Sequence, residues 1–218
     1  MLQSNTHRRT VRRSVGVSYR LLDKMPSELG SFSLKGVAMA IELVPLTADS
    51  RESFILSMKE AFDAFAVQDA SLPQDPSEPV ISYEVIDESI DHPHAVSYWA
   101  IDDGQAVGGV VLTFDPAKPA EGEYDLLFVK VGAQNRDHGL NIIKAVEKLY
   151  PQIKIWSLYT PYIEVRNIHF YVNKCGFKIV EFFNAKHPLT LSDGQRDEMS
   201  EDEPFFRFEK EILPHKRS

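Results

Sequence analysis

Residues 125–141 read DLLFVKVGAQNRDHGLN, and this stretch decides the fold because a strand pattern passes directly into a helix pattern. The apolar run 125–131 is typical of a buried strand, whereas the apolar residues after Gly139 recur at helical spacing. Backbone N–H groups at a helix start have no partner within the helix, and the helix dipole adds to their attraction for an anion. Each such contribution is about 0.3–1 kcal/mol, so several amides have to act together. The stretch therefore predicts a strand, a turn and a helix that form an anion site.

The rest of the chain supplies further strands and helices on both sides of this unit. Expected strands cover residues 41–47, 94–101, 106–114, 123–131, 153–159, 177–183 and 205–212. Expected helices cover residues 49–67, 81–90, 139–149 and 164–175. Between the second and third strands, Asp102-Asp103-Gly104-Gln105 is a hairpin signal. This order predicts an α/β (α+β) fold, with one mixed, mostly antiparallel central sheet and helices on both faces.

Two of these helices have a clear apolar face. In the helix at 49–67, the apolar residues at helical spacing are Phe54, Ile55, Met58, Ala61, Phe62 and Phe65. In the helix at 139–149, the residues expected to face inward are Ile142, Ile143, Val146 and Leu149. Pro151 is expected to end the second helix. Both helices are therefore predicted to pack on the sheet.

Composition excludes several classes of protein. The formal net charge of -8 argues against nucleic-acid binding, and no run of about 18 apolar residues is present to span a membrane. The one cysteine, Cys175, rules out an internal disulfide framework and suits a reducing cytosol, so a cytoplasmic protein is expected. No metal site is expected, because His92 and His94 lack a nearby third ligand and there is no cysteine pair for zinc.

The first 38 residues differ in charge from the rest of the chain. Seven Lys or Arg against two acidic residues give residues 1–38 a charge of +5, which leaves -13 for the remaining 180 residues. Three interpretations stay open: a disordered tail, an organellar transit peptide, or a stretch upstream of a true start at Met39. Met39 is followed at once by the first expected strand, so residues 39–218 are expected to form the domain.

A second informative stretch, residues 156–177, reads WSLYTPYIEVRNIHFYVNKCGF. Its Trp-x-Leu-x-Thr-Pro and Arg-Asn-x-x-Phe-Tyr motifs resemble a bacterial branch of the GCN5-related N-acetyltransferase (GNAT) superfamily. The resemblance covers about residues 41–213 and is strongest over residues 123–183. It implies a GNAT-like domain that uses acetyl-CoA as cosubstrate, without a metal, to acetylate an amine.

The resemblance also implies which residues meet the cofactor. In the family, an Arg/Gln-x-x-Gly-x-Gly/Ala loop binds the CoA pyrophosphate, and Arg136-x-x-Gly139 matches its first two positions. Backbone groups of the preceding strand are expected to meet the pantetheine arm, as an added strand would. The expected cofactor-binding residues are Val129, Val131, Arg136, His138, Gly139, Leu140, Asn141 and Asn167.

The expected catalytic residues are Tyr171, Asp125 and Glu123. Tyr171 matches the family's general acid, which hydrogen-bonds the CoA sulfur and protonates the leaving thiolate; a phenol with a pKa of about 10 is a competent donor at neutral pH. Asp125 lies near the place where several members of the family carry a proton-accepting Glu, and Glu123 is an alternative on the same face of the strand. A proton acceptor is useful because an amine with a pKa of about 10 is about one-thousandth neutral at pH 7, a penalty of about 4 kcal/mol. Either carboxylate could equally be an ordinary strand-end group in water.

The sequence departs from the family pattern at three positions. Asn141 stands where Gly or Ala is usual, Asp137 where Gly is common, and Glu164 where an Asn is usual. A carboxylate at 137 would repel a phosphate unless it points to solvent. These departures keep a second function open, a non-catalytic module that binds an acyl-CoA or a protein partner. The acceptor, a small-molecule or peptide amine, and a homodimeric state stay undetermined, because acceptor specificity resides in loops without a transferable pattern.

Overall fold

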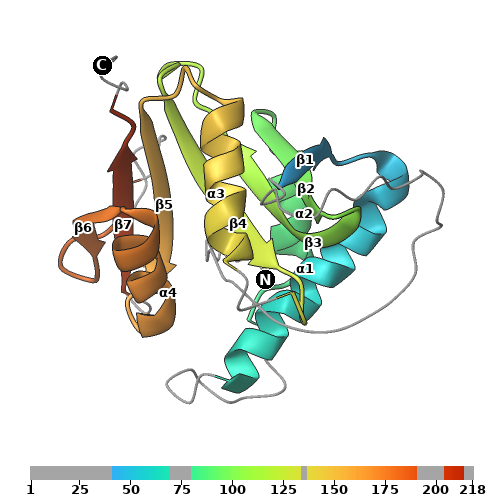
Figure 1. Cartoon of the computed structure of the whole chain (residues 1–218). Coiled ribbons are helices and arrows are strands. Elements are labelled where there is room, and N and C mark those ends of the chain that lie inside the picture. The colour runs from blue at the N-terminus through green and yellow to red at the C-terminus, as the bar shows by residue number, and fades with distance from the viewer. Residues whose placement is uncertain (1–40, 69–79, 134–136, 191–203, 214–218) are drawn as a thin grey trace, which may run out of the picture.

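The computed structural model describes residues 41–68, 80–133, 137–190 and 204–213 (Figure 1). Residues 1–38, whose charge differs from that of the rest of the chain, and residues 191–203 lie outside the described residues. The strands are β1 (Glu42–Pro45), β2 (Ala95–Asp102), β3 (Gln105–Thr113), β4 (Glu121–Val129), β5 (Ile155–Pro161), β6 (Lys178–Phe183) and β7 (Phe205–Glu211). The helices are α1 (Ala48–Gln68), α2 (Tyr83–Asp91), α3 (His138–Leu149), α4 (Val165–His169) and the π-helical η1 (Phe170–Cys175). Each expected strand and helix is present, with ends shifted by a few residues at most.

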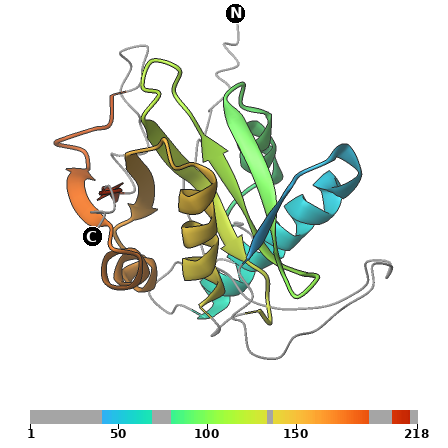
Figure 2. The same ribbon diagram turned by 45° about the horizontal axis from the view of Figure 1, so that its top comes forward.

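The strands form one sheet in the order β1-β2-β3-β4-β5-β7-β6. Neighbouring strands run antiparallel except β4 and β5, which are parallel. The predicted mixed, mostly antiparallel sheet is therefore confirmed. α3 and η1 pack on one face of the sheet, and α1 and α2 cover the other (Figures 1 and 2).

The turn between β2 and β3 confirms the hairpin signal. Asp102 pairs with Gln105, and the two residues between them have positive φ, 49° at Asp103 and 74° at Gly104. Two left-handed residues give a turn whose twist matches that of the flanking strands, and Asp-Gly is a favoured pair for it. The turn holds Asp102, the last residue of β2, within hydrogen-bond distance of His138 at the start of α3.

The face under α1 and α2 is filled by interlocking aromatic rings. Phe54 of α1 meets the rings of Trp99 and Phe128 edge-on, at centroid distances of 5.0 and 5.1 Å. Gly109 of β3 is required here, because a Cβ at that position would lie 2.4 Å from the Phe54 ring. The side chain of Phe65 lies outside the described residues. The helical spacing predicted for α1 is confirmed by its buried residues, Phe54, Met58, Ala61 and Phe62.

The other face departs from the prediction at two helix ends. Leu149 was expected to face inward and is 47% exposed; the prediction was wrong because α3 ends at this residue and Tyr150 turns back onto Phe114 and Trp156 instead. The expected helix at 164–175 is two helices of different kinds, since the short α4 leads directly into the π-helix η1. π-Helical turns are rare and occur often at functional sites.

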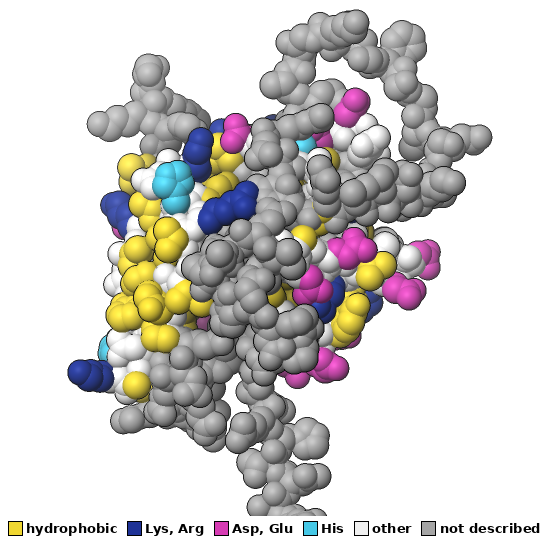
Figure 3. Space-filling model, turned by 90° about the horizontal axis from the view of Figure 1, so that it is seen from below, with side chains coloured by type: hydrophobic (Ala, Val, Ile, Leu, Met, Phe, Trp, Pro, Cys, Tyr) yellow, Lys and Arg dark blue, Asp and Glu magenta, His cyan; other side chains and the backbone are white. Residues whose placement is uncertain are grey.

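The end of the sheet at β6 carries exposed apolar side chains, namely those of Ile179, Val180 and Phe182. Figure 3 shows hydrophobic side chains gathered on the left of its view, the side on which Figure 1 places β6 and α4. This surface lies at the opposite end of the sheet from β1. Within the described ranges, no helix is both long and apolar enough to cross a membrane.

Candidate functional site

β4 and β5 are paired at one end and separate at the other. Their parallel ladder covers only Glu121–Glu123 against Ile155–Ser157. β4 continues to Val129 through its pairing with β3, and β5 continues to Pro161 through its pairing with β7. From Tyr124 onward, the edge of β4 that faces β5 has no strand partner among the described residues. Such an edge can hydrogen-bond an extended ligand in the way that it would bond another strand.

Asp125 occupies a β-bulge at the point where the two strands separate. The register of β4 against β3 skips Asp125, because Tyr124 and Leu126 pair with consecutive residues of β3. Asp125 is 8% exposed, and its carboxylate has no hydrogen bond or ion pair with the residues that the structure describes. Bulges redirect side chains and are common beside active sites, whereas a buried carboxylate without a partner lowers stability. The bulge thus holds the Asp125 carboxylate inside the protein.

Glu123, the alternative proton acceptor, precedes Asp125 by two residues and is half-buried. It is the last residue of β4 that pairs with β5, opposite Ser157. Tyr124 packs into the core beneath α3, and side chains alternate along a strand, so Glu123 points to the face that carries α1 and α2. Both candidate carboxylates therefore flank the separation of β4 and β5.

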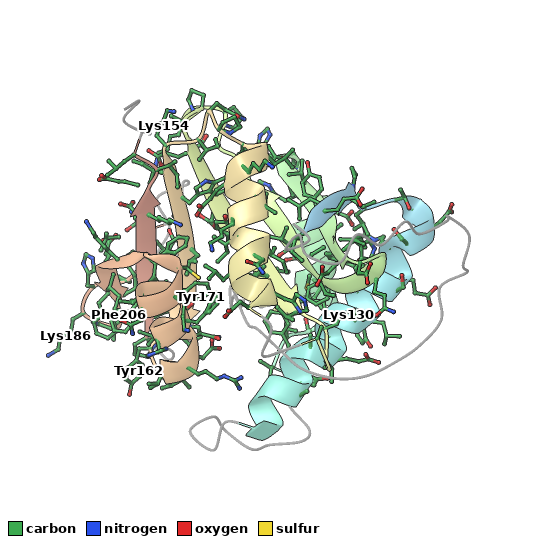
Figure 4. All side chains as sticks on the ribbon, viewed as in Figure 1. Lys130, Lys154, Tyr162, Tyr171, Lys186 and Phe206 are labelled. Carbon is green, nitrogen blue, oxygen red and sulfur yellow. The ribbon has the colours of Figure 1, made fainter. Side chains whose placement is uncertain are left out.

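Tyr171 lies in η1 and belongs to the core beneath α3, which also contains side chains of both separating strands. It is fully buried among the rings of Phe170, Phe177 and Phe208, and Figure 4 shows it between η1 and α3. Its hydroxyl has no hydrogen-bond partner in the described part of the chain. Burial raises the pKa of Tyr171 well above its ordinary value. The hydroxyl is thus a protonated donor without an acceptor among the described residues. Buried hydroxyls usually have a hydrogen-bond partner, so an acceptor on a bound ligand is expected here.

A second buried hydroxyl lies on β5. Thr160 is fully buried on the face that also holds Trp156 and Leu158, beyond the last pair between β5 and β4. Its Oγ1, like the hydroxyl of Tyr171, finds no hydrogen-bond partner among the described residues. No role was expected for Thr160, although a threonine at an inward position of an otherwise apolar strand was a usable signal. Within the described ranges, the α3 side of the separating strands therefore holds the unsatisfied hydroxyls of Tyr171 and Thr160.

The start of α3 lies against both β4 and η1. A Cβ on Gly139 would be 3.0 Å from the Phe170 ring and 3.6 Å from the Val129 side chain, so glycine allows this close approach. Gly139 and Val129 were expected at the cofactor site, and Phe170 immediately precedes Tyr171. The structure therefore brings the end of β4, the start of α3 and the start of η1 together.

The first amides of α3 are available as donors. His138 is the first helical residue, and the N–H of Asn141 donates to the carbonyl of Asp137 at 2.9 Å. The amides of His138, Gly139 and Leu140 therefore precede the first hydrogen bond within the helix. The amide of Asn141, also expected in the cradle, is engaged within the helix.

The turn before α3 differs from the expectation at one position and leaves another outside the described residues. β4 was expected to reach Val131, but it ends at Val129 and a turn follows, in which Gly132 has a φ of 92°. Arg136 lies outside the described residues. Asp137 has a φ of 55° and an exposed side chain, which explains why glycine is common at this position: the backbone is left-handed there. Its carboxylate faces solvent.

A model of the acetyltransferase (GNAT) family matches residues 59–177, more than half of the chain. The chain belongs to the GNAT family. The uncharacterized protein YrkN of Bacillus subtilis (strain 168) is 37% identical over 164 residues, which cover 73% of this GNAT chain and 83% of YrkN.

Solved structures share the GNAT fold. A Bacillus subtilis acetyltransferase in complex with CoA aligns with a TM-score of 0.50 at 20% identity, over 80% of this chain and 99% of that one. A spermidine N-acetyltransferase from Vibrio cholerae in complex with CoA and spermine aligns with a TM-score of 0.53 at 12% identity, over 79% of this chain and 95% of that one. At such identities the likeness establishes the fold alone.

This GNAT protein has a buried polar pair where the family usually has a single asparagine. Glu164 stands at the usual asparagine position, and Asn167 lies one turn later. Both side chains are buried, and Nδ2 of Asn167 donates to Oε2 of Glu164. Asn167 therefore lies inside the protein, next to η1, and not in solvent.

The remaining candidates for chemistry have simpler roles in the GNAT fold. Cys175 is buried, and burial raises its pKa to about 12, so it is a neutral thiol. His92 and His94 are exposed, with ring centroids 5.8 Å apart. No group of three or more His, Cys, Asp or Glu side chains suited to a metal occurs in the described ranges.

Proposed function

We propose that this GNAT protein transfers the acetyl group of acetyl-CoA to a primary amine, by direct attack of the amine on the thioester. The observation that carries the proposal is the separation of β4 and β5, together with the Asp125 carboxylate and the Thr160 and Tyr171 hydroxyls, which have no partner among the described residues. A catalyst for this reaction needs a proton acceptor on the amine side and a hydrogen-bond donor on the sulfur side. These residues supply both.

The residues present fit acetyl-CoA. The free edge of β4 up to Val129 would hold the pantetheine arm through backbone hydrogen bonds. The amides of His138, Gly139 and Leu140 would hold the pyrophosphate, since free N–H groups and the helix dipole both attract anions. The other residues proposed for this site are Val131, Arg136, Asn141 and Asn167.

The carboxylates on β4 would remove the proton from the acceptor. A primary amine is mostly protonated at pH 7, which costs about 4 kcal/mol to reverse. Asp125, or Glu123 two residues earlier, would accept this proton as the new N–C bond forms. A backbone amide of β4 would polarise the thioester carbonyl and stabilise the oxyanion.

Tyr171 would donate to the sulfur as the C–S bond breaks. Because burial raises its pKa well above the ordinary value, Tyr171 stays a phenol throughout the neutral range. An ordinary thiol has a pKa of about 8.5, so the departing thiolate is a weaker base than the phenolate of Tyr171. A hydrogen bond from the Tyr171 hydroxyl to the sulfur therefore precedes any full proton transfer. The hydroxyl therefore acts first as a hydrogen-bond donor to the departing sulfur.

The test has two stages. Acetyl-CoA is titrated into the protein by calorimetry, and thiol release from acetyl-CoA is then measured against a library of primary amines. The library includes monoamines, lysine peptides and the polyamines spermidine and spermine, since one structural neighbour is a spermidine N-acetyltransferase. We expect binding in the first stage and amine-dependent thiol release in the second.

The variant Asp125→Asn, assayed for thiol release, tests whether Asp125 is the proton acceptor. It should lower kcat with little change in acetyl-CoA affinity, because the carboxylate acts on the amine and not on the cofactor. Glu121→Gln is the matched control, since Glu121 lies on the same strand but is paired with Lys118 at the surface. Equal kcat values for the two variants would remove Asp125 from the mechanism and transfer the role to Glu123.

The alternative function is a non-catalytic module that binds an acyl-CoA or a protein partner, and the substitutions Asp137 and Asn141 favour it. Because the side chain of Asp137 is exposed, its carboxylate is a weaker argument against CoA binding. Acetyl-CoA binding without thiol release for any amine would support the module. A flat titration together with an unchanged melting temperature would exclude both acyl-CoA functions.

A further inference from the structure

The surface formed by α4 and β6 gathers exposed apolar side chains. Eleven large apolar side chains are exposed in the described ranges, and five of them lie between residues 162 and 182, namely Tyr162, Val165, Ile179, Val180 and Phe182. The ring of Phe182 connects this surface to its neighbours, at centroid distances of 6.3 Å from Tyr162 and 4.9 Å from Phe206, both of which lie beside α4 in Figure 4. Contiguous apolar surface of this kind is rare on soluble monomers and indicates an interaction site.

β6 is the last strand of the sheet at this surface. β7 pairs with one edge of β6, and the other edge has no strand partner among the described residues. Such an edge is a template for another strand, and natural proteins usually protect it with proline, charged side chains or a bulge. β6 reads KIVEFF, with no proline and an apolar centre at Ile179 and Val180. Whether its charges and its bulge repel or accept a second strand depends on where they point.

The bulge of β6 lies at Val180, which has no partner on β7. On one side of it, Lys178 pairs with Glu209 of β7. On the other side, Glu181 pairs with Arg207. Glu209 and Arg207 are two residues apart and form an ion pair at 2.6 Å, so they share one face of the sheet. The bulge therefore brings Lys178 and Glu181 to that same face, although they are three positions apart.

The apolar side chains of β6 point to the opposite face. Ile179 pairs with Phe208, which belongs to the core beneath α3. Phe182 pairs with Phe206, two residues earlier on β7 and packed against the same core. Ile179 and Phe182 nevertheless remain 43% and 40% exposed. The edge of the sheet thus carries one positive and one negative charge on one face and uncovered apolar groups on the other.

The sequence of β6 is complementary to itself across a two-fold axis. When two copies of β6 run antiparallel about a point between Ile179 and Val180, Lys178 of each copy lies opposite Glu181 of the other. In the same register, Ile179 of each copy lies opposite Val180 of the other. Opposite charges that face each other across two strands stabilise the pair, whereas like charges destabilise it. Because each contact occurs twice in a two-fold interface, two ion pairs would flank two apolar pairs.

We propose that two copies of this chain associate through β6 in this antiparallel register, with the exposed side chains of α4 and β6 packed around the two-fold axis. A second copy is favoured over an unrelated strand because the charges of β6 match those of β6 itself. β5, β7 and β6 of both copies would then form one continuous sheet. Within one copy, the ladder that joins β5 to β4 covers three residue pairs. The second copy would therefore brace β5, the strand that carries Thr160.

The experiment is sedimentation velocity of the full chain over a dilution series, which gives the Kd of the dimer. We expect the mass of two chains at the upper concentrations. Lys178→Glu and Glu181→Lys should each weaken dimerisation about tenfold, because each variant turns two attractive pairs into repulsive ones. An equal mixture of the two variants should regain nearly the parental Kd, since each glutamate of one chain then faces a lysine of the other. Damage within either chain would persist in the mixture.

Val180→Lys tests the apolar centre of the interface. A lysine without a partner beside the two-fold axis should weaken dimerisation at least about tenfold. Leu149→Lys is the matched control, because Leu149 is 47% exposed, as Val180 is 48% exposed, and lies at the end of α3. The control should keep the parental Kd, and thermal unfolding of each variant verifies that it is folded.

Three results would overturn the inference. The first is a wild-type protein that stays monomeric throughout the dilution series. The second is a dimer whose Kd is the same in Val180→Lys and in both charge variants, since the interface would then lie elsewhere. The third is a mixture of the charge variants that associates as weakly as its components. None of these measurements involves acetyl-CoA, so the proposed function and this inference stand or fall separately.

Discussion

The two faces of the sheet are both packed with aromatic side chains, but they differ in the polar atoms that they bury. Beneath α1 and α2, Phe54 and Phe128 bury rings that carry no polar atom, although the Ser97 hydroxyl, on the same face of β2 as Trp99, is also buried without a partner among the described residues. Beneath α3, the indole N–H of Trp156 and the hydroxyls of Thr160 and Tyr171 are buried without a partner among the described residues. Each such group costs about 1–3 kcal/mol. The first face is therefore mainly apolar, whereas the second holds the buried hydroxyls that the proposed cofactor would complete.

The largest expected effect comes from a pair of buried tyrosines on the α3 face. Tyr171→Phe should lower kcat by about 10²- to 10⁴-fold, the usual contribution of a positioned proton donor, with little change in acetyl-CoA affinity. Stability should hold or rise by about 1 kcal/mol, because the variant removes an unsatisfied hydroxyl. Steady-state kinetics and urea unfolding measure the two quantities.

Tyr124→Phe is the matched control for that variant. Tyr124 is as buried as Tyr171 and lies in the same core, but its hydroxyl donates to the carbonyl of Ile143 at 3.4 Å. The control should keep its kcat and lose about 1 kcal/mol of stability at most. If Tyr171→Phe keeps half or more of the parental kcat, measured where chemistry limits the rate, the Tyr171 hydroxyl has no catalytic role, like that of Tyr124.

Phe54→Ala tests the opposite face. Removing a fully buried ring that packs on Trp99 and Phe128 should lower the free energy of unfolding by about 3–5 kcal/mol. The folded fraction should still bind acetyl-CoA with nearly parental affinity, because the ring lies on the far side of the sheet. Urea unfolding and calorimetry at low temperature provide both values. A folded variant that has lost acetyl-CoA binding would show that the two faces are coupled.

Alkaline pH should weaken the α3 face. Burial raises the pKa of Cys175 to about 12 and those of Tyr124 and Tyr171 well above their ordinary value. The unfolded chain releases these protons at lower pH, so their contribution to stability is complete below about pH 8 and is lost as the pH rises toward the folded values. Each titrating group then removes about 1.4 kcal/mol per pH unit.

Cys175→Ala measures the share of one group in that decline. The free energy of unfolding, followed between about pH 9 and about pH 11, should fall less steeply in the variant than in the parent protein. Parallel slopes would mean that the Cys175 thiol titrates alike in the folded and unfolded chain.

The smallest expected effect is that of Thr160→Val. Valine keeps the shape and removes a hydroxyl without a partner, so stability should rise by about 1 kcal/mol. If the hydroxyl meets the cofactor, the KM for acetyl-CoA should increase by about three- to tenfold. Thr113→Val, on the half-buried end of β3, is the control. A stabilised variant with an unchanged KM would show that the Thr160 hydroxyl does not contact the cofactor.

Local patterns along the chain determined the order of the strands and helices. The alternation of apolar residues, the helical spacing at Phe54, Met58 and Phe62, and the Asp103-Gly104 turn act over a few neighbouring residues. The structure confirms each of them. The family resemblance added the cofactor and placed Tyr171 and Gly139 beside it, and the match to the GNAT family confirms the resemblance itself.

Only the tertiary structure decided how these elements meet. The bulge at Asp125 depends on the register of β4 against β3, and the separation of β4 from β5 depends on where their ladder stops. The contact of His138 with Asp102 joins residues 36 positions apart. Burial also left the Tyr171 hydroxyl without a partner, which no spacing in its own helix could indicate. Sequence patterns report the preferences of adjacent residues, whereas hydrogen-bond satisfaction and strand register depend on distant segments that only the folded chain brings together.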